Sequence, residues 1–180
     1  RYMHTHPTEF NHVSLWGADE NHVYAGGKYN DGFFWHYDGD DWLDVGPNTA
    51  EEQHSMWGSS WDNAVSVGTW KHIWRWDGSD WVCEHGKAGD CIYTSDDRNH
   101  HLEAVWGSGP DNIIAVGGSG GVLRYDGFAN TCGNGSPWCP EDPGTTTHLR
   151  GIWGSGANDV FVVGDGGTIL HYDGSWSPMT

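Results

Sequence analysis

Short runs of β-branched and aromatic residues recur along this chain, and each run ends in glycine or in Asp-Gly. The first set consists of VYAGG (23–27), AVSVG (64–68), IIAVG (113–117) and VFVVG (160–164). The second set consists of FFWHYDG (33–39), HIWRWDG (72–78), GVLRYDG (121–127) and TILHYDG (168–174). Runs of this length with turn residues between them predict short antiparallel strands joined by hairpins.

The runs belong to a repeat marked by tryptophan. Trp-Gly recurs at Trp16, Trp57, Trp106 and Trp153, at spacings of 41, 49 and 47 residues. Another tryptophan follows each Asp-Gly, namely Trp42, Trp81, Trp138 and Trp176. Each unit therefore predicts four strands: strand A ends in Trp-Gly, B in glycine, C in Asp-Gly, and D opens with tryptophan. Periods of about 40–45 residues with four strands per unit are typical of a β-propeller.

The predicted fold class is thus all-β, a β-propeller of four repeats of four antiparallel strands in one domain, 1–180. The blades are expected at about 11–46, 52–86, 102–141 and 149–180. Residues 1–10 would be a closing strand or the remnant of a preceding blade. The chain either closes a four-bladed ring or is part of a longer array. Four complete units without a partial fifth favour the closed ring, which leaves no sheet edge exposed.

The fourth unit carries a resemblance. Residues 153–176, WGSGANDVFVVGDGGTILHYDGSW, resemble a repeat of the form WGSGxxDVxxVGxxGTIxHYDGxxW found in secreted bacterial proteins. The C–D hairpin is also distantly similar to the Asp-box of BNR propellers, although the Asp-Gly spacing differs. The resemblance implies a propeller fold and no catalytic residue, because a fold alone does not define a function.

Charge narrows the classes of partner. There are 25 Asp and Glu residues against 8 Lys and Arg, which gives a formal net charge of −17. Nucleic-acid binding requires a basic surface and is therefore not expected, nor is binding to an anionic membrane surface. No apolar run approaches the ~20 residues of a membrane span. The chain begins at Arg1 without a signal segment, so we expect a processed product or a piece of something longer.

Four cysteines form two close pairs. Cys83 precedes Cys91, and Cys132 precedes Cys139, with one member of each pair in an insertion and the other on a D strand. The pattern predicts two local disulfides and therefore an oxidising location, either secreted, extracellular or at the cell surface. Their spacing does not match the short loops of zinc knuckles.

Histidines suggest a metal site. Most of the 12 histidines fall in or beside D–A or B–C segments, which share one rim of the predicted propeller. Neutral imidazole binds copper or zinc. The candidate ligands are His4, His6, His100 and His101, and the alternative is that these polar loops simply favour histidine.

Two further sets of residues suggest other ligands. Acidic side chains in the turn at Asp38, Asp40 and Asp41 would offer oxygens to calcium, although such turns also form without an ion. Trp61 and Trp70 lie outside the repeat pattern in expected turns, where they would stack on a glycan or contact a protein partner. They are expected on opposite rims.

No motif of a nucleophile, a zinc protease or a phosphate loop is present, and carboxylates occur in every turn. The sequence therefore predicts no enzyme and no required cofactor. It predicts a secreted, non-catalytic binding or assembly module that presents its D–A and B–C rim to an extracellular protein, to itself or to a glycan. A histidine-rich metal-binding protein for copper or zinc is the alternative, and a lectin-like propeller is another.

Overall fold

The protein folds into four antiparallel sheets of four strands each. The structure is a computed structural model, and it describes residues 11–28, 34–47, 52–84, 100–125, 127 and 136–179. In each sheet the strands lie side by side in sequence order. The first sheet contains β1 (Asn11–Asp19), β2 (His22–Lys28), β3 (Phe34–Tyr37) and β4 (Trp42–Asp44), and the second contains β5 (Gln53–Ser60), β6 (Asn63–Gly68), β7 (Ile73–Trp76) and β8 (Trp81–Cys83). The third contains β9 (Leu102–Gly109), β10 (Asn112–Gly117), β11 (Val122–Tyr125) and β12 (Trp138–Glu141), and the fourth contains β13 (Leu149–Gly156), β14 (Asp159–Gly164), β15 (Ile169–Tyr172) and β16 (Trp176–Pro178).

The prediction of an all-β propeller with four repeats of four strands is confirmed. The outer strand of every sheet begins at the tryptophan that the repeat pattern selected. The inner strands differ from the prediction, because they continue past Trp-Gly instead of ending there. In the second sheet β5 runs on from Gly58 to Ser60, with an irregularity in the ladder between these two residues. Each of the four inner strands ends two residues after the glycine of its Trp-Gly, so the turn begins two residues later than predicted.

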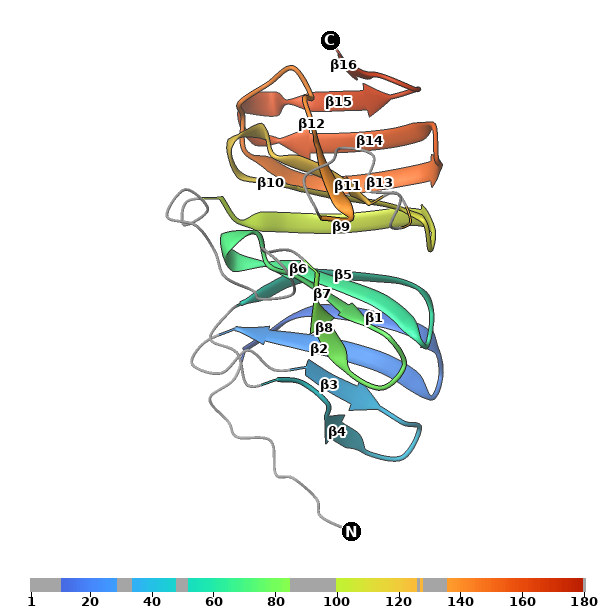
Figure 1. The fold of residues 1–180 in the computed structure, drawn as a ribbon. Helices are drawn as coiled ribbons and strands as arrows, with labels where there is room; N and C mark the ends of the chain where they lie inside the picture. Colours follow the sequence, from blue (N-terminus) through green and yellow to red (C-terminus); the bar gives the residue numbers. More distant parts are fainter. Residues whose placement is uncertain are drawn as a thin grey trace.

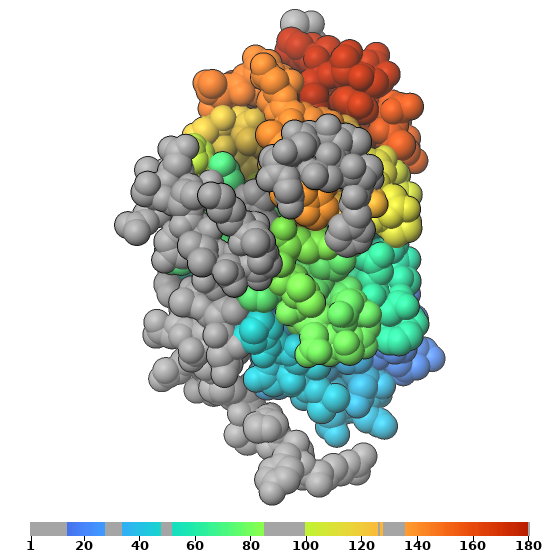
Figure 2. Space-filling view, viewed as in Figure 1, coloured from blue at the N-terminus to red at the C-terminus, as the bar shows by residue number. Residues whose placement is uncertain are grey.

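The sheets follow one another in a row. The inner strand β1 contacts β5, β5 contacts β9, and β9 contacts β13. Figure 1 shows this order from the first sheet (blue) at the bottom to the fourth (red) at the top, and the surface in Figure 2 has the same order. In the part of the chain that the structure describes, β1 and β13 lie at opposite ends of the row. The expected closure into a four-bladed ring is not formed there, because the first and fourth sheets do not pack face to face.

Each junction between neighbouring sheets contains an apolar cluster. Tyr24 and Phe34 of the first sheet pack against Trp74, Trp76 and Trp81 of the second. The second and third sheets enclose Val65, Ile73, Ile113 and Trp138, and the third and fourth enclose Ile114, Val116, Val160 and Leu170. The second and third sheets are thus buried and apolar on both faces, which explains why their strands are continuous hydrophobic runs rather than alternating ones.

The Trp-Gly dipeptide joins one sheet to the next. Neighbouring residues of a strand point to opposite faces, so the tryptophan faces the following sheet and the glycine faces the preceding one. A Cβ atom on Gly58 would lie 2.5 Å from the Trp16 ring, and one on Gly107 would lie 2.7 Å from the Trp57 ring. Gly154 and Trp106 repeat this contact. Glycine is required because the indole occupies the space of a side chain.

Three turns of 3-10 helix join the second and third strands of the last three sheets: η1 (Thr69–Lys71), η4 (Gly118–Gly120) and η5 (Asp165–Gly167). None of the helices in the described residues has the length and apolar character needed to cross a membrane.

Candidate binding rim

The three 3-10 turns and the beginnings of the inner strands β5, β9 and β13 form one end of the sheets, which we call the histidine rim. Backbone hydrogen bonds connect the two parts in the same way in each sheet. The Thr69 amide donates to the Glu52 carbonyl at 3.0 Å, the Gly118 amide to that of His101 at 2.9 Å, and the Asp165 amide to that of His148 at 2.9 Å. The repeat therefore places titratable side chains side by side.

A row of histidines and glutamates crosses three sheets on this rim. His148 Nε2 lies 3.0 Å from Glu103 Oε1, and His54 Nδ1 lies 3.5 Å from Glu103 Oε2. On the other side of His54, its Nε2 lies 3.6 Å from Glu52 Oε2. All four side chains are partly buried. These side chains lie next to solvent, in orientations that their contacts across the sheets hold.

His101 extends the row toward the second sheet. Its Nδ1 accepts a hydrogen bond from the Trp70 amide at 3.2 Å, and its ring lies 6.0 Å from that of His54. Burial lowers the pKa of the His101 imidazole, and the neighbouring His54 lowers it further. A neutral His101 is consistent with its role as an acceptor.

A hollow of about 120 Å³ opens beside His101. Its walls include Lys71, His100 and Glu141 and its apolar part includes Leu102, Val122, Leu123 and Pro140. The hollow is bounded by Gly118 and Gly121. Gly121 occupies the position after the 3-10 turn where the second sheet has His72 and the fourth has Thr168, with nearly the same backbone angles. Because Gly121 has no side chain, part of the hollow stays open where the other two sheets carry His72 and Thr168.

Two of the predicted metal ligands, His100 and His101, line this hollow. The other two, His4 and His6, lie outside the described residues. Among the described residues no group of three or more His, Cys, Asp or Glu side chains is placed to hold a metal ion. A copper or zinc site that uses His4 and His6 stays a prediction.

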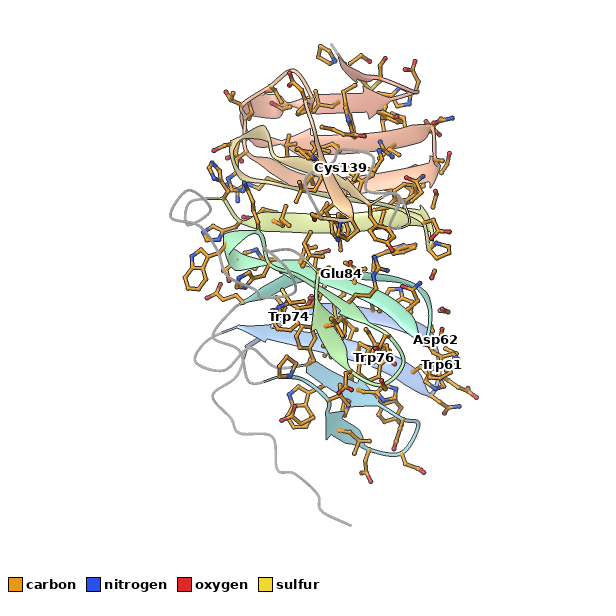
Figure 3. All side chains as sticks on the ribbon, in the orientation of Figure 1. Trp61, Asp62, Trp74, Trp76, Glu84 and Cys139 are labelled. Atoms are coloured by element: carbon orange, nitrogen blue, oxygen red, sulfur yellow. The ribbon has the colours of Figure 1, made fainter. Side chains whose placement is uncertain are left out.

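The tryptophans expected to bind a glycan do not form one site. Trp70 lies in η1 on the histidine rim, whereas Trp61 lies in the turn after β5, at the right-hand end of the sheets in Figure 3. The Trp61 ring is half exposed and packs at 5.3 Å from that of His22. Glycan binding by either residue stays a prediction.

In the acidic turn predicted to bind calcium, the Asp38 carboxylate accepts hydrogen bonds from the backbone of the turn itself. Asp38 Oδ1 accepts hydrogen bonds from the Asp40 and Asp41 amides, both at 2.9 Å. These bonds, that of Asp41 first, lower the pKa of the Asp38 carboxyl. Asp77 makes the same turn in the second sheet with Ser79 and Asp80. The geometry is therefore that of a repeated hairpin, and calcium binding there stays a prediction.

Cys83 and Cys139 are each disulfide-bonded and lie at β8 and β12. Their predicted partners Cys91 and Cys132 lie outside the described residues. The pairing, and the secreted location inferred from it, remain predictions.

The third strands carry His36, Arg75, Arg124 and His171 at equivalent positions, and the contacts of these side chains were not predicted from the sequence. Arg75 Nε donates to Glu84 at 2.5 Å, and Glu84 also accepts a hydrogen bond from Trp138 Nε1 of the third sheet at 3.0 Å. Figure 3 shows Glu84 at this junction. The third and fourth sheets repeat the arrangement. The sequence did contain a signal for this contact, since a glutamate stands at the same distance after the tryptophan that begins each of these two outer strands.

Comparison with known proteins agrees with the fold. No protein-family model matches this sequence, and no curated protein matches it. The structure is similar to YCF48 from Cyanidioschyzon merolae, with a TM-score of 0.61 and 17% sequence identity over 97% of this chain. The match covers 57% of that chain, so the present chain spans less than two thirds of it. A second structure, YCF48 bound to D1 peptide, has a TM-score of 0.41 and 13% identity, and the match covers 99% of this chain and 69% of that one. The first of these two likenesses shows a propeller fold.

Proposed function

We propose that this chain is a non-catalytic protein-binding module and that a segment of its partner binds along the histidine rim. The observation that carries the proposal is the hollow beside Gly121 and His101. Small-molecule sites usually measure about 300–1,000 Å³, so a hollow of about 120 Å³ is suited to a single side chain. A partner would place one apolar residue in it while its neighbouring residues contact the row of Glu103 and His54.

Charge supports a basic partner segment. The chain carries a net charge of −17, and the rim contributes Glu52, Glu103 and Glu141. Complementary charge increases association rates more than it increases affinity. Binding is therefore expected to slow as the salt concentration rises.

Backbone strain on the rim supports a functional role as well. Trp70 has φ 55° and Ser119 has φ 56°, in the left-handed region where the fourth sheet has Gly166. A non-glycine residue in a rarely occupied region costs on the order of 1–3 kcal/mol, and such residues gather at binding and catalytic sites. In the second sheet this conformation places the Trp70 amide against His101.

The test uses peptides selected from a random library on the immobilised protein, with affinities then measured by titration calorimetry. Gly121→His adds the side chain that the second sheet carries at this position, and it should weaken the selected peptides about tenfold or more. Thr168→His makes the matching change in the fourth sheet, outside the hollow, and should leave the affinity unchanged.

Selected peptides that bind Gly121→His as tightly as the wild type would refute the proposed site. A loss of binding on Trp61→Ala, with Gly121→His unaffected, would place the binding surface at the opposite end of the sheets.

A further inference from the structure

The row of sheets ends in a face whose counterparts are buried at every other junction. Val67 and Val116 are both 0% exposed, whereas Val163, at the same position of the fourth sheet, is 48% exposed. Ile73 is fully buried in the second sheet, and its counterpart Ile169 is 44% exposed. The fourth sheet thus presents the apolar residues of a junction without a following sheet in the described chain.

The Trp-Gly contact is incomplete at both ends, and the two ends are complementary. Trp153 has the position of Trp16, Trp57 and Trp106, but its side chain is 60% exposed. Gly17 is exposed, and the three atoms nearest to a Cβ built on it belong to His22 and Val23 of its own sheet. The fourth sheet therefore offers an indole without a glycine, and the first sheet offers a glycine without an indole.

Part of the first sheet's outer face follows the same pattern. Leu15 is 66% exposed, whereas Met56 at the same position of the second sheet is 8% exposed. Tyr37 is partly buried, whereas its counterpart Trp76 is buried. Ala25 and Trp35 on this face are already buried, and Trp42 packs against them. The open part of the face is consequently the part around Leu15, Gly17 and Tyr37.

A contact between an arginine of one third strand and a tyrosine of the next sheet's third strand is also incomplete at the two ends of the row. Arg75 lies 4.2 Å from the ring centroid of Tyr125 in the next sheet, and the following junction repeats this contact. His171 is the fourth-sheet counterpart of Arg75, and Tyr37 is the first-sheet counterpart of Tyr125. The imidazole of His171 stacks on Phe161 of its own sheet. An imidazole and a phenol ring thus occupy, at the two ends of the row, the positions of the arginine and the aromatic ring that meet at these two junctions.

We propose that the fourth sheet of one copy packs on the first sheet of a second copy, so that two copies close a ring head to tail. Trp153 would lie on Gly17 of the second copy, and His171 would approach its Tyr37. End repeats that stay solvent-exposed usually carry a polar outer face, and these two ends are apolar instead. A head-to-tail contact that closes leaves no free end.

The test is the mass of the intact chain in solution, measured by light scattering or sedimentation at micromolar concentration. The expected species has twice the 19.9 kDa of one chain. Trp153→Ala removes the indole and Gly17→Val fills the space for it, and each should weaken association about tenfold or more. Trp61→Ala, another exposed tryptophan outside both end faces, is the matched control and should leave the dimer intact.

Mixing the two variants distinguishes this geometry from other dimers. A ring of one Trp153→Ala copy and one Gly17→Val copy retains one wild-type junction, so the mixture should recover part of the dimer that neither variant forms alone. Circular dichroism confirms that the variants are folded. The proposal would be overturned by a wild-type chain that remains at 19.9 kDa, or by a dimer that neither variant weakens. Either result would mean that the two end faces do not bind each other.

Discussion

At the scale of single residues, the glycine of Trp-Gly has a different role from the one that its sequence context suggests. Glycine after a β-prone run usually indicates a turn. Here Gly107 lies within a strand, and its φ is not in the left-handed region. It is required because the Trp57 ring from the preceding sheet fills the space of its side chain. The pattern within one repeat does not reveal this contact, since the tryptophan comes from another repeat.

The contact predicts a difference between two nearby glycines. Gly107→Ala would place a methyl group 2.7 Å from the Trp57 ring, whereas a methyl group on Gly109 meets no atom within 4 Å. Overpacking a core typically costs about 1–3 kcal/mol, so Gly107→Ala should lower the free energy of unfolding by that amount. Gly109→Ala should change it little. Urea denaturation of both variants measures the difference, and equal values would contradict the proposed steric cause.

A second residue-scale prediction concerns the loss of folding stability at low pH. Burial lowers the pKa of His36 below its usual 6.5, and the nearby His22 lowers it further. The unfolded chain therefore binds this proton at a higher pH than the folded one, and stability is lost as the pH falls below about 6.5. His36→Phe keeps a ring against Tyr24, on which His36 stacks at 4.6 Å. Unfolding by urea at about pH 7.5 and about pH 5.5 should show a smaller loss for the variant than for the wild type. An equal loss would mean that other groups carry the effect.

At the scale of elements, the outer strands hold the sheets together by two different means. Glu84, just after β8, and Glu141, the last residue of β12, each bind both an arginine of their own sheet and a tryptophan of the next. The first sheet has Val45 at this position, and it packs into the apolar cluster instead. Trp81 Nε1, the counterpart of the Trp138 Nε1 that binds Glu84, is buried without a hydrogen-bond partner. The repeat thus accepts either a polar or an apolar junction.

This alternation predicts how variants of Arg75 and Glu84 behave. Both side chains are nearly buried, so Glu84→Ala leaves an uncompensated arginine and should cost about 3–5 kcal/mol. The double variant Arg75→His with Glu84→Val copies the first sheet and should lose less than the single variant. Chemical denaturation of the single and double variants measures the comparison. A double variant that is no more stable than Glu84→Ala would show that the two types of junction are not interchangeable.

At the scale of the whole molecule, the sequence predicted the number of sheets, their strand order and the outer-strand tryptophans, because these features depend on local period and turn chemistry. Ring closure was not predictable in this way, since it depends on the angle that each packed junction adds. The histidine rim was expected from the alternation of strand direction. The hollow at Gly121 and the pairing of His54 and His148 with Glu103 were not expected, because they arise only when neighbouring repeats are brought together.

The Trp-Gly dipeptide has one further consequence, for how such a chain can change its length. Each dipeptide carries the indole for the sheet after it and the space for the indole of the sheet before it. An in-frame duplication or deletion of one whole repeat therefore carries both halves of the contact with it, and the two new neighbours already match. The number of repeats can change by genetic accident without a compensating substitution at any junction.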